Sequence, residues 1–272
     1  MNYHDNSRVR IQEESLVEAA PDCAAFARTR LGFEPDATQA RVLDHSIRRG
    51  MLNCTRQWGK STVMAIKALY QAYFFPGTLT LVLSPSERQS GMLVNKIRRM
   101  GRKLGVETKR DGLNRVSMVF PNDSKIVGLP DSEAKIRGFD DVRLMLVDEA
   151  SRVDEELYNA VTPMLGVNDG SLWLISTPFG KRGFFYREWT GREEWVRIAV
   201  PATECPRLPR RFLEEERRRK PDRVFRREYL CEFHDDEGSC PFPRHLVERS
   251  MRSDIAPLLQ DVSWVRQRKL TR

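Results

Sequence analysis

The stretch Cys54-Thr55-Arg56-Gln57-Trp58-Gly59-Lys60-Ser61 decides the fold of this chain. It follows the short strand-like segment 50–54 and precedes small and apolar residues at helical spacing, which predict a helix from Ser61 to about Phe74. Gly-Lys-Ser at such a junction supplies backbone amides, an ammonium and a hydroxyl, which suit a phosphate and Mg²⁺. We interpret the stretch as a variant P-loop (Walker A motif) with Cys54 in place of the usual glycine. The alternative is an ordinary helix start.

A second motif strengthens this interpretation. The apolar run Leu144–Val147 is followed by two adjacent carboxylates, Asp148 and Glu149. In a P-loop fold, the acid at the end of such a strand (Walker B motif) binds Mg²⁺ through water, and the next acid polarises the water that attacks the γ-phosphate. The alternative, a solvated acidic turn after a core strand, is disfavoured by the order and context of the two motifs.

A third motif is the run Leu172–Pro178, which predicts a buried strand that ends in the small hydroxyl residues Ser176 and Thr177. Ligands of open α/β sheets bind at the carboxyl ends of the strands. The two hydroxyls are therefore candidates to contact the catalytic water or the γ-phosphate. Alone the motif is weak, since Ser-Thr-Pro is also an ordinary strand-ending turn.

Strand-like and helix-like segments alternate along the chain, which predicts an α/β fold with a mostly parallel sheet covered by helices. The segments Val116–Phe120 and Lys125–Leu129 form either a hairpin or successive strands. The remaining predicted elements are a helix that starts near Asp36 or Thr38 with Gln39 in its first turn, a strand at Thr78–Ser84, a helix at Glu87–Leu104 with Met92 and Ile97 among its apolar positions, and a helix from Asp154 to about Leu165.

The texture changes after residue 200, where three prolines break the chain and two basic helical segments follow, Arg210–Lys220 and Asp222–Tyr229. We expect a core at residues 1–200, with 1–32 as an N-terminal extension, a small lid subdomain at 201–250, and a tail at 251–272.

Composition excludes several classes of protein. With 40% hydrophobic and 31% charged residues and no long apolar run, the sequence predicts a soluble protein without a membrane span or a signal peptide. The five cysteines form no CxxC pair, which argues against a zinc site and a disulfide framework and favours a reducing compartment. The net charge of +8 permits a polyanionic partner, although scattered surface charge explains it equally well.

Together these motifs resemble the ATPase domain of the large terminase subunits of tailed phages. The resemblance runs from about Phe33 to Val247 and rests on the Thr-Arg-Gln-x-Gly-Lys-Ser loop, on Lys135–Phe139 before the acidic pair, and on Glu149–Ser151 after it. Its most specific part is Ser176–Gly180, followed by Gly183–Tyr186 and Trp189. It implies a P-loop NTPase of the ASCE/RecA-like class that hydrolyses ATP and translocates double-stranded DNA.

The resemblance also implies residue roles. Glu149 would be the catalytic base, with Arg56 on the γ-phosphate and Arg137 as an arginine finger acting on a neighbouring subunit. Gln39 would recognise adenine, and Ser176 with Thr177 would couple hydrolysis to movement. The nucleotide would be bound by Thr55, Arg56, Gln57, Trp58, Gly59, Lys60, Ser61 and Thr62, and its Mg²⁺ by Ser61 and Asp148. For Gln39 an exposed helical glutamine, and for Arg137 a structural corner, are the alternatives.

The implied setting is the host cytoplasm at a viral procapsid, where a homo-oligomeric ring would dock on a portal protein with a small terminase subunit as partner. DNA contacts would be independent of sequence, with Lys103, Lys109, Arg110 and the arginines 217–219 as candidates. Large terminases usually continue into a nuclease domain; the tail shows no strand with a carboxylate cluster, so we expect no cleavage activity in this polypeptide. The rival functions are a helicase-like ATPase and a nucleic-acid-binding or capsid-docking module with a vestigial ATPase.

Overall fold

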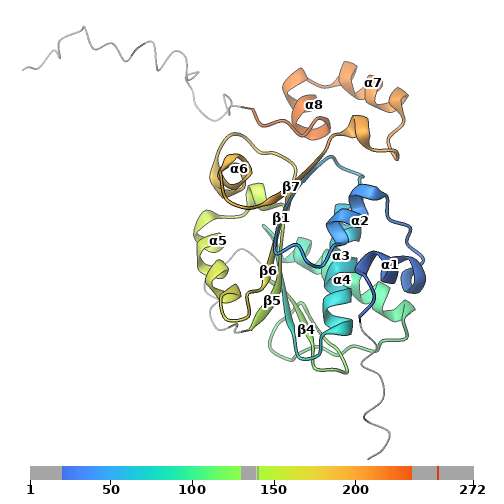
Figure 1. Ribbon diagram of the computed structural model, residues 1–272. Helices are drawn as coiled ribbons and strands as arrows, with labels where there is room; N and C mark the ends of the chain where they lie inside the picture. Colours follow the sequence, from blue (N-terminus) through green and yellow to red (C-terminus); the bar gives the residue numbers. More distant parts are fainter. Residues whose placement is uncertain (1–19, 130–138, 140, 235–249, 251–272) are drawn as a thin grey trace, which may run out of the picture. The chain divides into compact units, whose positions relative to one another are not determined.

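A twisted sheet carries the three predicted motifs (Figure 1). The computed structural model describes residues 20–129, 139, 141–234 and 250. Within these residues the strands are β1 (Arg49–Cys54), β2 (Leu79–Leu83), β3 (Ser117–Val119), β4 (Lys125–Leu129), β5 (Val142–Asp148), β6 (Ser171–Ser176) and β7 (Val196–Val200). They follow the spatial order β3-β4-β2-β5-β6-β1-β7, and every neighbouring pair is parallel except β3 with β4. The predicted mostly parallel α/β sheet is confirmed.

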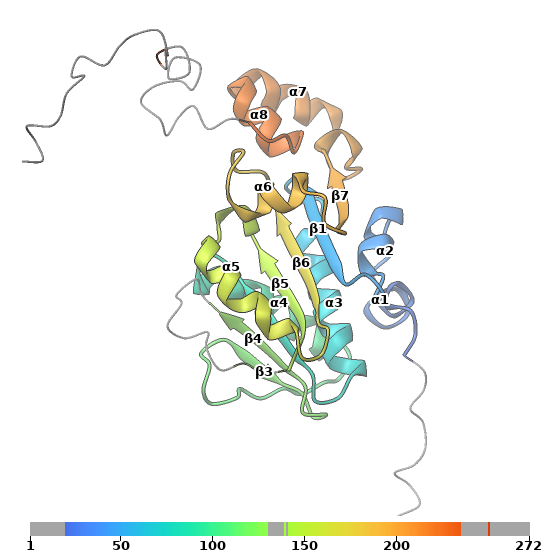
Figure 2. The ribbon, with the colours of Figure 1, turned by 60° about the vertical axis from the view of Figure 1, so that its left-hand side comes forward.

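Helices cover both faces of this sheet (Figures 1 and 2). They are α1 (Cys23–Leu31), α2 (Ala37–Leu43), α3 (Lys60–Phe74), α4 (Glu87–Lys103), α5 (Glu155–Val161), α6 (Gly183–Thr190), α7 (Arg210–Arg219) and α8 (Asp222–Tyr229), with short 3-10 helices at Ala150–Arg152, Thr162–Leu165 and Ala202–Glu204. Helices α1–α4 pack on one face and α5 and α6 on the other, each over a separate apolar cluster. No helix in these described ranges is long and apolar enough to cross a membrane.

Local chemistry explains why the elements begin where they do. The Asp36 side chain accepts from the Gln39 amide, and the Gln39 side chain accepts from the Asp36 amide, so a reciprocal capping box starts α2. Ser86 caps α4 through the Gln89 amide. Residue 50 must be glycine, because a Cβ there would lie 2.5 Å from the Trp173 ring of the neighbouring strand.

Three expectations need correction or completion. Helix α1 is absent from the predicted elements of the N-terminal extension, although Asp22 caps its start and Gly32 ends it in the left-handed conformation. The helix expected to reach Leu165 stops at Val161 and continues as a 3-10 turn, because Pro163 cannot donate to an α-helical ladder. Met92, one of the apolar positions of the predicted helix at Glu87–Leu104, is not part of the buried face of α4, since it is 63% exposed. The hairpin alternative for β3 and β4 is confirmed.

Parallel pairing brings the motifs to one edge of the sheet. Strands β5, β6 and β1 are neighbours, with Asp148 paired to Ile175 and Asn53 paired to Ser176. Since parallel strands end on the same side, the P-loop, the acidic pair and the Ser176-Thr177 turn meet there. Helices α7 and α8 lie beyond this same edge (Figure 1).

Candidate active site

The loop between β1 and α3 has the backbone of a phosphate cradle. The Thr55 amide donates to Val200 O (2.9 Å), which ties the start of the loop to β7. Gly59 has a φ of 105°, a conformation that L side chains rarely adopt, and α3 begins at the next residue. The Lys60 ammonium reaches across the loop to Cys54 O (2.7 Å). The first-turn amides of α3 and this ammonium are therefore placed to bind an anion.

Two side chains hold this loop from outside. The Gln39 Nε2 atom and the Arg207 guanidinium both donate to Trp58 O, at 3.1 and 2.6 Å. Gln39 is fully buried, and its oxygen is engaged in the capping box of α2. In this structure Gln39 therefore positions the loop, and its adenine role stays a prediction. Arg207 was not identified from the sequence, because 149 residues separate it from Trp58.

Asp148 and Glu149 stand at the end of β5, opposite the loop. Burial raises the pKa of Asp148 to about 6, the neighbouring Glu149 adds to the rise, and Lys60 opposes it. Glu149 is in the left-handed conformation (φ 53°), and its amide donates to Asp148 Oδ1 (3.1 Å). The half-buried Asp148 carboxylate together with the hydroxyl of Ser61 is an oxygen donor set that fits Mg²⁺.

A serine pair joins the acidic turn to the end of β6. The Ser151 and Ser176 hydroxyl oxygens lie 2.7 Å apart, the Ser151 amide donates to Ser176 Oγ (3.2 Å), and the Ser151 hydroxyl donates to Thr177 O (2.9 Å). Ser176 and Thr177 are both buried. The turn that follows Glu149 is thus fixed to the candidate coupling residues, and Ser151 is a site residue that had no role assigned from the sequence.

A lysine of α4 contacts the first turn of α3 at the candidate site. The Lys96 ammonium donates to the Thr62 hydroxyl (2.8 Å) in the first turn of α3. Burial and Arg99 lower the pKa of Lys96, and Asp148 opposes that shift. Lys96 therefore contributes positive charge beside the acidic pair, and the predicted ligand Thr62 has its hydroxyl bound to it. Nothing in the local sequence around Lys96 marks this role, since α4 carries many cations.

The other loop side chains lie at the interface with α8. The Arg56 Nε atom contacts Glu228 Oε2 at 2.8 Å, and the Thr55 hydroxyl donates to Glu228 O (3.3 Å). Burial alone would raise the pKa of Glu228, but Arg56 and Arg227 together hold it below its usual value. Gln57 is exposed with a φ of 70°. The loop and the predicted lid are therefore joined by an ion pair. Arg137 lies outside the described residues.

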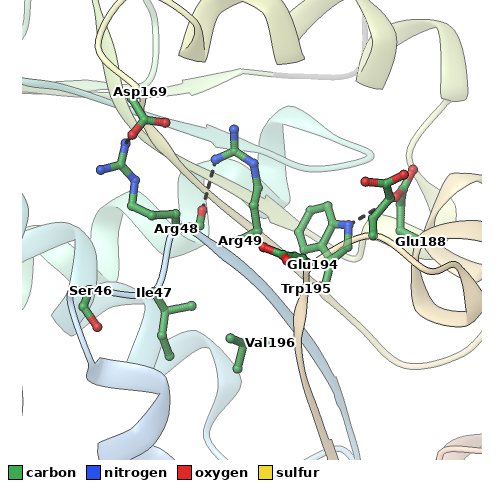
Figure 3. A pocket seen from close by; sticks show the side chains of 10 residues that line it. Ser46, Ile47, Arg48, Arg49, Asp169, Glu188, Glu194, Trp195 and Val196 are labelled. Carbon is green, nitrogen blue, oxygen red and sulfur yellow. Dashed lines mark hydrogen bonds and ion pairs between the residues drawn. The ribbon is translucent and has the colours of Figure 1, made fainter.

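A cavity of about 860 Å³ lies at the other end of the sheet, where β1 and β7 begin (Figure 3). Among its lining residues, Arg48 contacts Asp169 at 2.5 Å, and Trp195 Nε1 donates to Glu188 (3.2 Å). It contains none of the predicted site residues. The P-loop, the acidic pair and the Ser176-Thr177 turn lie instead at the carboxyl edge of the sheet.

Comparison with known proteins identifies relatives of this arrangement. The family model for the terminase large subunit, T4likevirus-type, N-terminal, matches residues 51–248. The large terminase subunits of Thermus phage G20c and Thermus virus P23-45 are each 23% identical over 239 residues, covering 75% of this chain and 49% of the relative. The chain thus spans about half the length of the curated relatives it matches.

Solved structures share the fold. The large terminase ATPase domain of Thermus phage P74-26 superposes with a TM-score of 0.68 at 21% identity, over 76% of this chain and 97% of that domain. The large terminase of bacteriophage HK97 gives 0.65 at 17% identity, over 79% and 55%. A large terminase from a thermophilic bacteriophage, solved in complex with ADP, gives 0.62 at 17% identity, over 76% and 59%.

Proposed function

Because the chain belongs to the terminase large subunit N-terminal family of the T4likevirus type, we propose that it is the ATP-hydrolysing motor domain of a viral DNA-packaging enzyme. The observation that carries the proposal is the meeting of the P-loop, the acidic pair and the Ser151–Ser176 contact at one edge of the sheet. In an open α/β fold, the carboxyl edge of the sheet is where a nucleoside triphosphate would bind.

In the proposed mechanism, Lys60 and the first-turn amides of α3 bind the β- and γ-phosphates. Ser61 and Asp148 would hold Mg²⁺, which neutralises phosphate charge when it is bound. Glu149 orients and polarises the attacking water, and the serine pair keeps the turn that carries Glu149 in place. A pKa of about 6 for Asp148 means that a bound cation would favour its charged form.

Residues 201–234, the described part of the lid, would move when the nucleotide binds and is hydrolysed. Arg56 is held by Glu228 of α8, and the γ-phosphate offers the same guanidinium a competing anion. Binding and hydrolysis would then shift Arg56 between phosphate and carboxylate, while the Ser176-Thr177 turn reports the state of the site. The lid would change position relative to the sheet as a result.

The DNA would be held through its phosphates by the C-terminal half of α4 and the loop after it. Burial and the like charges of Arg110 and Arg102 lower the pKa of Arg98, so three guanidiniums crowd together. Among the described residues, none of the six cations Arg98, Arg99, Arg102, Lys103, Lys109 and Arg110 forms an ion pair. By contrast, Arg211 of α7 and Lys220 just after it pair with glutamates of α7, and Glu214–Glu216 offset the charge of the arginines 217–219. The candidates Lys103, Lys109 and Arg110 are favoured accordingly.

The DNA contact is tested by measuring affinity for random duplex DNA across salt. Replacing Arg98, Arg102 and Arg110 by alanine should flatten the plot of log affinity against log salt by about 0.9 per lost phosphate contact. Arg28→Ala, which removes an exposed arginine of α1 paired with Glu34, is the matched control. An unchanged slope in the triple variant would exclude this face.

Assembly into a ring on a portal, with a small subunit and with Arg137 acting in trans, is part of the same proposal. The two rivals remain separable from it. A helicase-like ATPase should unwind duplexes, and a docking module with a vestigial ATPase should show no turnover. Only the motor requires specific activity that rises with protein concentration.

The deciding experiment is steady-state ATP hydrolysis across protein concentration, with and without duplex DNA. Glu149→Gln should abolish turnover while keeping nucleotide binding, and Arg137→Ala should abolish the concentration dependence. Glu156→Gln, at an exposed glutamate of α5, is the control and should be as active as the wild type. If the wild-type protein never hydrolyses ATP, even when bound to portals, the motor function is refuted and the docking module with a vestigial ATPase takes its place.

A further inference from the structure

The ring of Phe179 lies among three guanidiniums. The Cζ atoms of Arg152, Arg182 and Arg227 lie 4.5, 5.4 and 5.8 Å from its centroid. Phe179 is partly exposed and belongs to neither apolar cluster of the sheet. Its neighbours are therefore those of a cation–π site, where a ring quadrupole attracts charge within about 6 Å, rather than those of a core residue.

Two of these arginines belong to segments that contact the candidate site, the turn after Glu149 and α8. Arg152 ends the 3-10 turn after Glu149, and its Nε atom lies 4.0 Å from Glu149 Oε2. Arg227 belongs to α8 and contacts Glu228 at 3.0 Å, and Glu228 holds Arg56 of the P-loop. Phe179 itself follows Ser176 and Thr177 in the same turn. The Phe179 ring thus contacts both Arg152, the partner of Glu149, and Arg227, the partner of Glu228.

We propose that Phe179 is a positioning residue that couples the docking of α8 to the placement of Glu149. The inference rests on the proposed ATPase function, in which Glu149 polarises water. Arg227 and Arg152 share one aromatic surface, so removal of Arg227 from the ring changes how Arg152 packs there. Arg152 in turn shares its charge with Glu149. Such a coupling is reciprocal, so nucleotide at Glu149 also biases α8.

A cation–π contact suits this task better than a hydrogen bond. A guanidinium can shift across a ring face without breaking a directional donor–acceptor pair, so the link tolerates the movement that it transmits. The Ser151–Ser176 contact anchors the same turn from its other side. Glu149 is thereby held by one fixed contact and one adjustable contact.

The test compares Phe179→Leu, which keeps apolar bulk, with Phe179→Tyr, which keeps the aromatic face. Phe75→Leu is the matched control, because that partly buried ring stacks on His45 (5.0 Å between centroids) away from the carboxyl edge. Amide hydrogen exchange is measured in segment 149–153 before and after Arg227→Gln. This readout needs no nucleotide and reports transmission from α8 to the catalytic turn.

We expect Arg227→Gln to speed exchange in 149–153 about three- to fivefold in chains with Phe179 or with Phe179→Tyr, but not in the Phe179→Leu background. Steady-state kcat should fall about three- to tenfold in Phe179→Leu, with KM for ATP within about twofold, and Phe179→Tyr should restore it. Equal responses to Arg227→Gln in all backgrounds would overturn the proposal, as would Phe179→Leu behaving like Phe75→Leu. Wild-type protein without turnover would instead refute the proposed function, and the exchange measurement would still decide the coupling.

Discussion

Lys67 is a buried cation that ties α2 to α3, and its replacement by methionine gives a quantitative test. Its side chain is 1% exposed, and its ammonium donates to Val42 O (3.2 Å) and Asp44 O (2.7 Å). It also lies 4.8 Å from the centroid of the Trp173 ring. Lys67 thus holds the C-terminal end of α2, while Gln39 at the other end contacts the P-loop.

The expected change in the free energy of unfolding follows from the pKa of Lys67. Burial lowers the pKa of Lys67 from 10.5 to about 8, and Cys23 and Asp44 oppose this shift. Below pH 8 the amine is charged in both the folded and the unfolded chain, and the folded state carries a penalty of about 3 kcal/mol for burying that charge. Between pH 8 and 10.5 the unfolded chain binds more protons than the folded one. The contribution of Lys67 to the free energy of unfolding therefore rises with pH across this window, by about 3 kcal/mol in total.

Urea unfolding of wild type and Lys67→Met at half-unit steps from about pH 7 to 10.5 measures this contribution. Only the difference between the two proteins is informative, because burial raises the pKa of Cys231 to about 12 and makes both proteins less stable above about pH 9. Methionine leaves the carbonyls of Val42 and Asp44 at the end of α2 without this donor, which costs about 1–3 kcal/mol each at every pH.

We expect the wild type to gain about 3 kcal/mol over Lys67→Met between pH 8 and 10.5. Lys125→Met, at an exposed lysine that begins β4, should show no such pH-dependent difference. A difference between wild type and Lys67→Met that stays flat over this range would refute the reasoning. It would mean that the two carbonyls and the ring fully offset the loss of solvent around the ammonium.

Three further predictions concern the site. Ser176→Ala leaves the Ser151 amide without its acceptor and should lower kcat for ATP about tenfold at constant KM; unchanged kcat would show that the serine pair is dispensable. Arg207→Ala removes one of the two donors to Trp58 O and should raise KM about threefold, with kcat preserved in the same assay. Glu228→Gln frees Arg56, whose side chain is 67% exposed, so the screened ion pair contributes less than about 1 kcal/mol to unfolding. That variant should bind a fluorescent ATP analogue about threefold more tightly, and weaker binding would contradict the competition between phosphate and Glu228.

The predictions that succeeded depend on residues close together in the sequence. The start of α3 after Gly59 was predictable, because a left-handed glycine and the first residues of the helix are consecutive in the sequence. The run Leu144–Glu149 and the strand ending at Ser176 were recognisable for the same reason, since a buried strand of a parallel sheet is a continuous apolar run. Helix α1 was missed because charged residues interrupt its apolar positions, and only its capping residues mark it.

The sequence by itself therefore determined the α/β class and the three motifs that meet at the carboxyl edge. Tertiary structure alone decided what each of them touches. Gln39 and Arg207 contact the same carbonyl from positions 19 and 149 residues away, and the Phe179 ring contacts arginines of the turn after Glu149 and of α8. Such contacts leave no local sequence pattern, because the partners are far apart in the chain. The segment between them only has to bring its two ends together, and many sequences can do this.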